Sequence, residues 1–285
     1  MTTRAGVLAD EHRLLGATMA QSGVTDYLVP ERYAGEADAS ESLDGVALCD
    51  LTGMVYDLVS GSSASALAEC AFAGRRLAVG ECRFEALCAG DGSLVGVPLV
   101  MRTGDGEYAV IDASQRAETS EDWLAFLANV EGEGGRAFPD AAVEDATQMM
   151  VPLVLWGHRV GEVLGDYLHG AQAKEGLPRT GELRNRSLDD IPCIVCTLPV
   201  GGPAPCCLVL VPVPRARALW RSLLSFPVVH PVGHEGLRGA LSRTLPWWGL
   251  LAGEGPLRER RSTLEGWGLV RKGDGGFVGV RQLIG

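Results

Sequence analysis

Cysteine is the residue type in this sequence with the widest chemistry, because thiolates bind metals and act as nucleophiles. Eight cysteines occur among 285 residues. Cys193 and Cys196 form a C-x-x-C pair, and Cys206 and Cys207 follow shortly after. This arrangement is a candidate for a zinc site or a redox pair. The neighbouring residues are typical of apolar strands, which favours reduced thiols packed in a core. We therefore predict no metal site.

The histidines and serines also lack a catalytic arrangement. His230 and His234 are separated by Pro231, so they cannot share the helix face that an i, i+4 metal pair needs. The serines around Gly61 occupy a predicted turn and lack the pattern of a nucleophile elbow. The residues alone therefore predict no catalytic group.

Hydrophobic periodicity predicts the elements that would position these side chains. Apolar residues at three- and four-residue steps predict a first helix over residues 7–19. Gly90-Asp-Gly92 and Gly104-Asp-Gly106 are hairpin signals between apolar runs. In the first half we predict strands over 45–50, 54–58, 82–88, 94–102 and 107–112, and helices over 64–72 and 120–130. In the second half we predict strands over 146–155, 193–197 and 207–213, and helices over 160–168 and 216–224.

The overall composition is that of a globular protein. Hydrophobic residues make up 46% of the chain, enough for a sizeable core. The net charge of −11 disfavours binding to a phosphate backbone, so we expect no nucleic-acid partner. We find neither a signal peptide nor an apolar stretch of the roughly 18 residues that span a bilayer. These features predict a cytoplasmic protein without a membrane partner.

Two motifs near the N-terminus indicate a family. Leu8-Ala-Asp-Glu-His12 is followed by Leu15-Gly-Ala17, and Cys49-Asp-Leu-Thr-Gly-Met54 comes later. They resemble the L-x-x-x-H-x-x-L-G-A and D-[LV]-[ST]-x-M motifs of the aminomethyltransferase family, which includes the glycine-cleavage T-protein and its folate-binding relatives. In that family the histidine of the first motif, here His12, is more readily a structural hydrogen-bonding group than a catalytic one.

The resemblance continues in order along most of the chain. Further matching segments are 80–84, 91–102, 110–116, 153–157, 245–249, 263–269 and 277–283. The resemblance implies an α+β fold, in which antiparallel sheets are flanked by helices. It also implies a first T-protein-like subdomain over 1–135 and a second over 136–285. T-proteins continue into a further β-barrel domain, which we expect to be absent here.

The resemblance implies tetrahydrofolate as cofactor and the transfer of one-carbon units. In the family a D-D-[LV] carboxylate lies beside the reactive folate nitrogen, and a glutamate holds the pterin ring. The aspartates are replaced here by Gly96 and Val97, and no Asp or Glu occurs between Ile191 and His234, where the glutamate would fall. The family asparagine becomes Asp112, for which Arg116 is a nearby candidate partner.

Aligned with the family channel, the predicted cofactor-binding residues are Met54, Phe84, Val97, Leu99, Met101 and Asp112. The apolar members of this set are equally well explained as ordinary core residues of strands.

Two functions follow from the resemblance. The first is tetrahydrofolate-dependent aminomethyl or methyl transfer by a divergent T-protein-like protein, with a small one-carbon donor or folate as partner. The alternative is a non-catalytic binding or subunit protein that kept the fold and lost the carboxylates. Trp247, Trp248 and Leu250 are candidates for an apolar patch that binds a second copy or a partner subunit.

Overall fold

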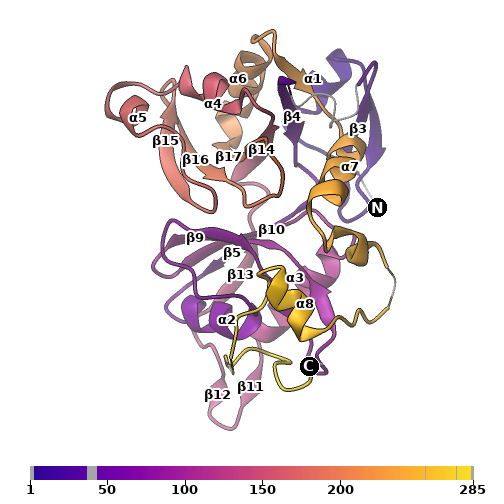
Figure 1. Ribbon diagram of the computed structural model, residues 1–285, viewed down its shortest axis with the longest axis vertical. Coiled ribbons are helices and arrows are strands. Elements are labelled where there is room, and N and C mark those ends of the chain that lie inside the picture. The colour runs from indigo at the N-terminus through magenta and orange to yellow at the C-terminus, as the bar shows by residue number, and fades with distance from the viewer. Residues whose placement is uncertain (1–2, 37–43, 254, 274, 284–285) are drawn as a thin grey trace. The chain divides into compact units, whose positions relative to one another are not determined.

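A computed structural model describes residues 3–36, 44–253, 255–273 and 275–283. The chain divides into two compact units, each built from two separate stretches of sequence. Unit 1 contains residues 1–53 and 147–245, and unit 2 contains residues 54–146 and 246–285. Figure 1 traces the chain through both units. The division at residue 135 into two T-protein-like subdomains remains a prediction.

Unit 1 is built on a six-stranded sheet of order β15-β16-β17-β14-β4-β18. Its central strands are nearly continuous apolar runs, as expected for strands covered on both faces. In β17 every residue except the last is buried. The strands are β4 (Val46–Asp50), β14 (Met150–Trp156), β15 (Leu183–Leu188), β16 (Ile191–Thr197), β17 (Cys206–Pro212) and β18 (Val229–Pro231).

Amphipathic helices pack on this sheet. Trp220 and Leu223 of α6 (Val213–Leu224) join the core formed by the sheet and α4 (Val160–Gly165). The other helices of unit 1 are α1 (Ala9–Leu14), α5 (Gly170–Glu175) and α7 (His234–Thr244). A small sheet of order β1-β3-β2 completes the unit, formed by β1 (Arg4–Ala5), β2 (Ala17–Gln21) and β3 (Tyr27–Tyr33).

Unit 2 is built on a five-stranded sheet of order β13-β5-β10-β9-β6. The described strands of this sheet pair antiparallel throughout. They are β5 (Val55–Ser60), β6 (Cys82–Phe84), β9 (Leu99–Gly104), β10 (Glu107–Asp112) and β13 (Ala142–Asp145). The helices are α2 (Ala64–Ala71), α3 (Ala117–Ala128) and α8 (Arg261–Gly266), with a 3₁₀ turn η2 (Trp248–Ala252). Two small hairpins pair β7 (Leu87–Cys88) with β8 (Leu94–Gly96), and β11 (Glu131–Gly132) with β12 (Gly135–Arg136).

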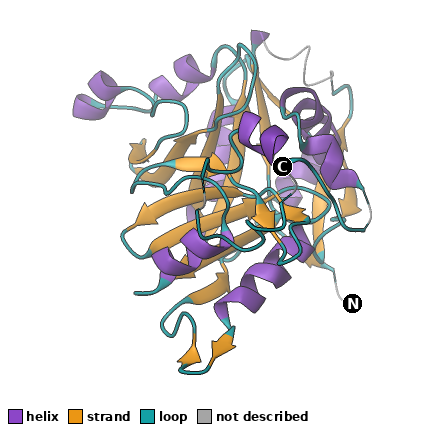
Figure 2. Cartoon of the chain, turned by 60° about the horizontal axis from the view of Figure 1, so that its bottom comes forward, coloured by secondary structure: helices purple, strands orange, loops and turns teal. Residues whose placement is uncertain are grey.

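The two faces of the unit 2 sheet have different neighbours. Val59, Val100 and Val110 project from one face into a core shared with α2 and α3. Side chains alternate along a strand, so Leu99 and Met101 project from the opposite face. Figure 2 shows helices lying against the sheets. This alternation decides which predicted residues can lie together.

The α+β fold class is confirmed, and so are most of the predicted elements. The glycine-centred turns join β7 to β8 and β9 to β10 as predicted. The first helix is shorter than predicted: α1 ends at Leu14, and Gly16 then adopts a φ of +77° before β2 begins. The predicted single strand over 94–102 is divided into β8 and β9, since Pro98 has no N–H for a continuous ladder. Residues 131–136 form the β11–β12 hairpin.

The predicted core position of the cysteines is confirmed. Cys193 and Cys196 lie on β16, and Cys206 and Cys207 begin β17. All four are buried. No group of three metal-ligating side chains occurs within the described ranges. No helix in the described part of the chain is both long and apolar enough to cross a membrane.

Candidate functional site

Three of the predicted residues form one apolar surface in unit 2. Phe84 on β6 lies opposite Leu99 on β9, and Met101 lies two residues further along β9. Directly paired residues of an antiparallel ladder project from the same face. Leu99 and Met101 are buried, whereas Phe84 is partly exposed. We call Phe84, Leu99 and Met101 the apolar wall.

Aromatic side chains extend the wall. The ring of Trp247 lies 5.6 Å from that of Phe84, and Trp267 lies 6.4 Å from Trp247. Trp247 is only 6% exposed, so the prediction that it contributes to an exposed patch was wrong: its ring is covered by packing within unit 2. The Nε1–H of Trp247 is buried without a hydrogen-bond partner in the described structure. An unpaired buried donor is costly to the fold.

Met54 and Val97 are buried at the ends of elements. Met54 directly precedes β5, and Val97 lies in the short connection between β8 and β9. Their exposed fractions are 5% and 4%. Both positions are those of buried residues beside strand ends.

Asp112 does not join the apolar wall. It ends β10, and its carboxylate accepts hydrogen bonds from the backbone N–H of Ser114 at 2.9 Å and from Ser120 Oγ at 2.8 Å. Ser120 belongs to α3, so this carboxylate points to the helix-bearing face of the sheet. Its partners anchor the start of α3, and both oxygens are already used in structure.

The expected pairing of Asp112 with Arg116 was wrong. Arg116 donates instead to the backbone carbonyls of Val95, Gly253 and Gly255. A planar guanidinium has several donors, and here they join the β8 strand to the segment after η2. Asp112 needs no cation because two hydrogen-bond donors satisfy it.

Gly96 leaves no room for the family carboxylate. A Cβ on Gly96 would lie 2.0 Å from Ser120 Oγ and 3.3 Å from Asp112 Oδ2. Any side chain there would displace the hydroxyl that binds Asp112. The glycine at position 96 and the Asp112–Ser120 hydrogen bond are therefore two parts of one local arrangement.

The first-helix histidine has a structural role, as expected. His12 Nε2 lies 2.9 Å from Asp50 Oδ2, and its Nδ1 lies 2.7 Å from the Tyr33 hydroxyl. Asp50 Oδ1 also accepts from the N–H and hydroxyl of Thr52. His234 contacts the backbone carbonyl of Asp50, and burial lowers the pKa of this imidazole. This buried network joins α1, β3, β4 and α7 within unit 1 and uses the polar atoms of His12 for structure.

Comparison with known proteins identifies the family. The model of the GCVT N-terminal domain family matches residues 8–235. The chain belongs to this family. A curated aminomethyltransferase from Streptomyces avermitilis is 30% identical over 176 residues, which cover 59% of this chain and 45% of that protein. The match therefore spans less than half the length of that relative.

The fold is that of a solved family member. The glycine cleavage system aminomethyltransferase T from Bartonella henselae superposes with a TM-score of 0.72 at 18% identity, over 98% of this chain and 73% of that chain. At this identity the likeness establishes the fold alone. The heterotetrameric sarcosine oxidase from Corynebacterium sp. U-96, in complex with pyrrole 2-carboxylate, matches with a TM-score of 0.45 at 16% identity. That score is too low to support an argument.

The described residues do not fit the carboxylate-based way of holding tetrahydrofolate. Within the apolar wall only Phe84 is partly exposed, and the Nε1–H of Trp247 is a buried donor without a partner in the described structure. A pterin edge with adjacent donors would need a carboxylate, and Asp112 is occupied on the other face of the sheet.

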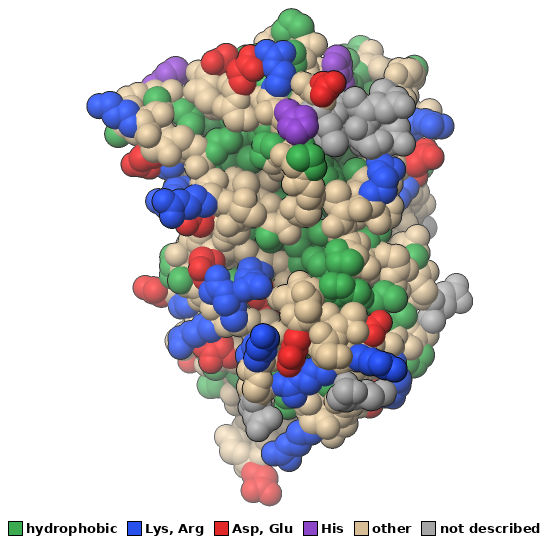
Figure 3. Space-filling view, viewed as in Figure 1, with side chains coloured by type: hydrophobic (Ala, Val, Ile, Leu, Met, Phe, Trp, Pro, Cys, Tyr) green, Lys and Arg blue, Asp and Glu red, His purple; other side chains and the backbone are tan. Residues whose placement is uncertain are grey.

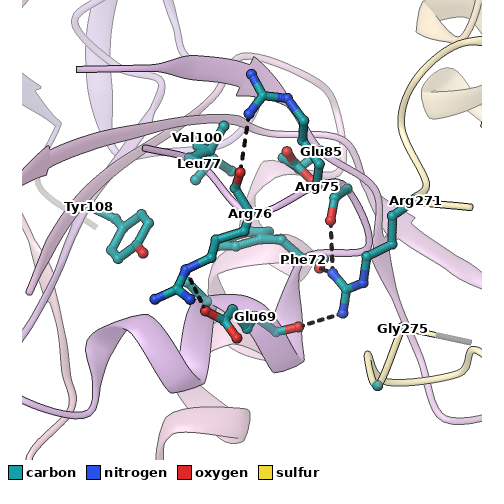
Figure 4. Close-up of a pocket in the computed structure, with 13 residues that line it drawn as sticks. Glu69, Phe72, Arg75, Arg76, Leu77, Glu85, Val100, Tyr108, Arg271 and Gly275 are labelled. Atoms are coloured by element: carbon teal, nitrogen blue, oxygen red, sulfur yellow. Dashed lines mark hydrogen bonds and ion pairs between the residues drawn. The ribbon is translucent and has the colours of Figure 1, made fainter. Parts of the chain in front are cut away.

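Sequence reasoning missed a cavity of about 270 Å³ in unit 2, shown in Figure 4. None of the six predicted residues lines it. The cavity contains Glu85, which is only 1% exposed. Glu85 lies among charged residues in the sequence, between Arg83 and the apolar run that follows, and a glutamate there is normally at the surface. No signal in the sequence could have found it.

Proposed function

We propose that this chain is a divergent T-protein-like protein of tetrahydrofolate-dependent one-carbon transfer, which kept the fold and the apolar wall without the acid–base groups. In this role it binds a folate or a small one-carbon donor through apolar and aromatic contacts. The observation that carries the proposal is the family match over residues 8–235. The match of the whole chain to a T-protein fold agrees with it.

The geometry favours binding over T-protein-type aminomethyl transfer. General acid–base catalysis requires an ionisable group within reach of the reacting atom. Gly96 cannot carry one, Val97 has none, and Asp112 is held by Ser114 and Ser120. A non-catalytic folate-like binding or subunit role is therefore the second candidate, and the same three positions favour it.

The experiment is a calorimetric titration of the purified chain with tetrahydrofolate, repeated for F84A and F126A. Phe84 contacts Trp247 in the apolar wall, whereas Phe126 is an exposed phenylalanine of α3 in the same unit and serves as the matched control. We expect weak binding that F84A reduces and F126A leaves unchanged. Equal binding by both variants would remove the apolar wall from the proposal.

One-carbon transfer itself is tested separately, by following methyl transfer to tetrahydrofolate from N-methylated donors. Transfer that depends on Phe84 would support the enzymatic form of the proposal. Binding without transfer would support the non-catalytic form. The absence of both binding and transfer would contradict both forms of the proposal.

A further inference from the structure

The cavity around Glu85 lies on the helix-bearing face of the unit 2 sheet. Its walls include Ala68 of α2, Phe72, Leu77, Val100 of β9 and Tyr108 of β10. Its volume of about 270 Å³ is just below the roughly 300–1,000 Å³ typical of pockets for drug-sized ligands. The cavity therefore suits a small metabolite. Leu99 and Met101 project from the opposite face, so this is a different site from the apolar wall.

The segment after α8 forms part of the cavity lining. The backbone N–H of Ala86 donates to Leu269, and that of Arg271 donates to Ala73. Arg271 also donates to the backbone carbonyls of Glu69, Phe72 and Gly74. These bonds fix the guanidinium at the edge of the cavity, as Figure 4 shows.

Glu85 is a buried acid without an ion pair in the described structure. Neither carboxyl oxygen makes a hydrogen bond of ordinary geometry there, although the amide of Gly74 favours its charged form. The carboxyl group lies against Gly74, where a Cβ would be 1.6 Å from Oε2. A buried, unsatisfied carboxyl group is costly to the fold, and such a group facing a cavity is the common signature of a binding site.

The charges of the lining follow a simple pattern. Arg75 forms an ion pair with Glu81, and Arg76 forms one with Glu69. Figure 3 shows Lys and Arg side chains gathered over the part of unit 2 that carries α2 and α8. Among the described lining residues, this leaves one acid and one base without an ionic partner: Glu85 and Arg271.

Glu85 and Arg271 both contact Gly74, but at different atoms. Gly74 is their common neighbour, since its Cα side faces Glu85 and its carbonyl accepts from Arg271 at 2.8 Å. A guanidinium has five N–H donors, and Arg271 uses three hydrogen bonds in holding the backbone. Donors therefore remain for an anionic group. One cavity thus offers an acceptor for a cation and donors for an anion.

We propose that this cavity binds an α-amino acid with an apolar side chain. Its ammonium group contacts Glu85, its carboxylate contacts Arg271, and its side chain packs against Phe72 and Leu77. A zwitterion is the ligand class whose two charges match both unpaired groups, whereas a simple cation would face the arginines and a simple anion would face Glu85. This inference is independent of the proposed folate-related function.

The pH dependence of binding follows from the surroundings of Glu85. Burial raises its pKa to about 8, and Arg83, the amide of Gly74, Arg271 and Arg75 oppose the shift. The other charged groups of the lining are Arg76 and Glu69, which pair with each other. An ammonium group binds the ionised carboxylate. Affinity should therefore rise with pH, by up to about tenfold per unit, until it levels near pH 8.

The test is calorimetric titration of the full chain with L-leucine, L-methionine and L-phenylalanine at pH 8. The two comparison ligands are 4-methylpentanoate, which lacks the ammonium group of leucine, and isoamylamine, which lacks its carboxylate. We expect binding of at least one amino acid and none of the comparison ligands. Failure of all three amino acids at millimolar concentration would overturn the proposal. So would equal binding of either comparison ligand.

The first variant is E85Q, which removes the charge of the side chain and keeps its shape. The second is E81Q, which removes the ionic partner of Arg75 at a residue that does not line the cavity. E85Q should lower amino-acid affinity by at least about thirtyfold, and E81Q should change it little. Unchanged affinity in E85Q would overturn the proposal. If E85Q fails to fold, the wild-type pH profile decides, because an affinity that is flat between pH 6 and 8 would also overturn it. Tetrahydrofolate titration of the same samples shows whether the folate-related proposal fails independently.

Discussion

Substitution of Gly96 by alanine tests whether position 96, which the resemblance aligns with a family aspartate, is a packing position. The new Cβ would lie 2.0 Å from Ser120 Oγ, so the hydroxyl must leave its place. That movement breaks its 2.8 Å hydrogen bond to the buried carboxylate of Asp112. Loss of a hydrogen bond to a charged group costs about 1.5–3 kcal/mol, which sets the expected decrease in the free energy of unfolding.

A double-mutant cycle isolates this cause. In S120A the hydroxyl is already absent. The remaining contacts of the new Cβ are Ser120 Cβ at 3.4 Å, which is ordinary, and Asp112 Oδ2 at 3.3 Å, which requires a shift of a few tenths of an ångström. G96A should then cost less than about 1 kcal/mol, so the coupling energy between the two sites should reach about 1.5–3 kcal/mol.

The assay is urea-induced unfolding followed by tryptophan fluorescence. G90A is the control, since a Cβ at Gly90 meets nothing within 4 Å, and it should be neutral within about 0.5 kcal/mol. An equal cost of G96A in both backgrounds would refute the reasoning.

Three further predictions concern ionisation, catalysis and metals. The free energy of unfolding should fall as the pH rises from about 4.5 towards 8, because the pKa of Glu85 is raised from 4.5 to about 8 in the folded state and the unfolded chain ionises first. E85Q should remove a decrease in the free energy of unfolding on the order of 5 kcal/mol. The decrease that remains should reflect Asp57, whose pKa burial raises to about 7. Parallel pH profiles of the wild type and E85Q would contradict this prediction. The chain should not release ammonia from an aminomethylated carrier protein at T-protein rates, since loss of a positioned proton-transfer group costs roughly 10²–10⁴ in rate, and robust release with tetrahydrofolate would refute this. Elemental analysis should find no stoichiometric zinc or iron, and a metal lost in C193S would contradict the core assignment of the cysteines.

The sequence was informative where local patterns determine the structure. Glycines at Gly104 and Gly106 predict the β9–β10 hairpin, which places Leu99 and Met101 on one face by strict alternation. The family resemblance placed Phe84 in the same set, and the ladder puts it opposite Leu99. This neighbourhood follows from periodicity and from the resemblance, whereas a binding role for it remains a prediction.

The rest of the site depends on contacts between distant segments. Trp247 is buried because Phe84, far from it in the sequence, packs against its ring. The partners of Asp112 follow from the position of α3, and charge alone suggested Arg116 instead. Glu85 is buried where the segment after α8, around Leu269 and Arg271, packs beside it. No local sequence pattern predicts this contact between distant segments.

Tetrahydrofolate titration of the wild-type chain, F84A and D112N tests the central claim most directly. The account predicts weak binding, with a dissociation constant above about 1 µM, because a lost bidentate charged pair removes roughly 2–5 kcal/mol. It also predicts that F84A weakens binding more than D112N, since Phe84 belongs to the apolar wall and Asp112 points to α3. A sub-micromolar dissociation constant, or binding that D112N abolishes and F84A leaves intact, would contradict the account.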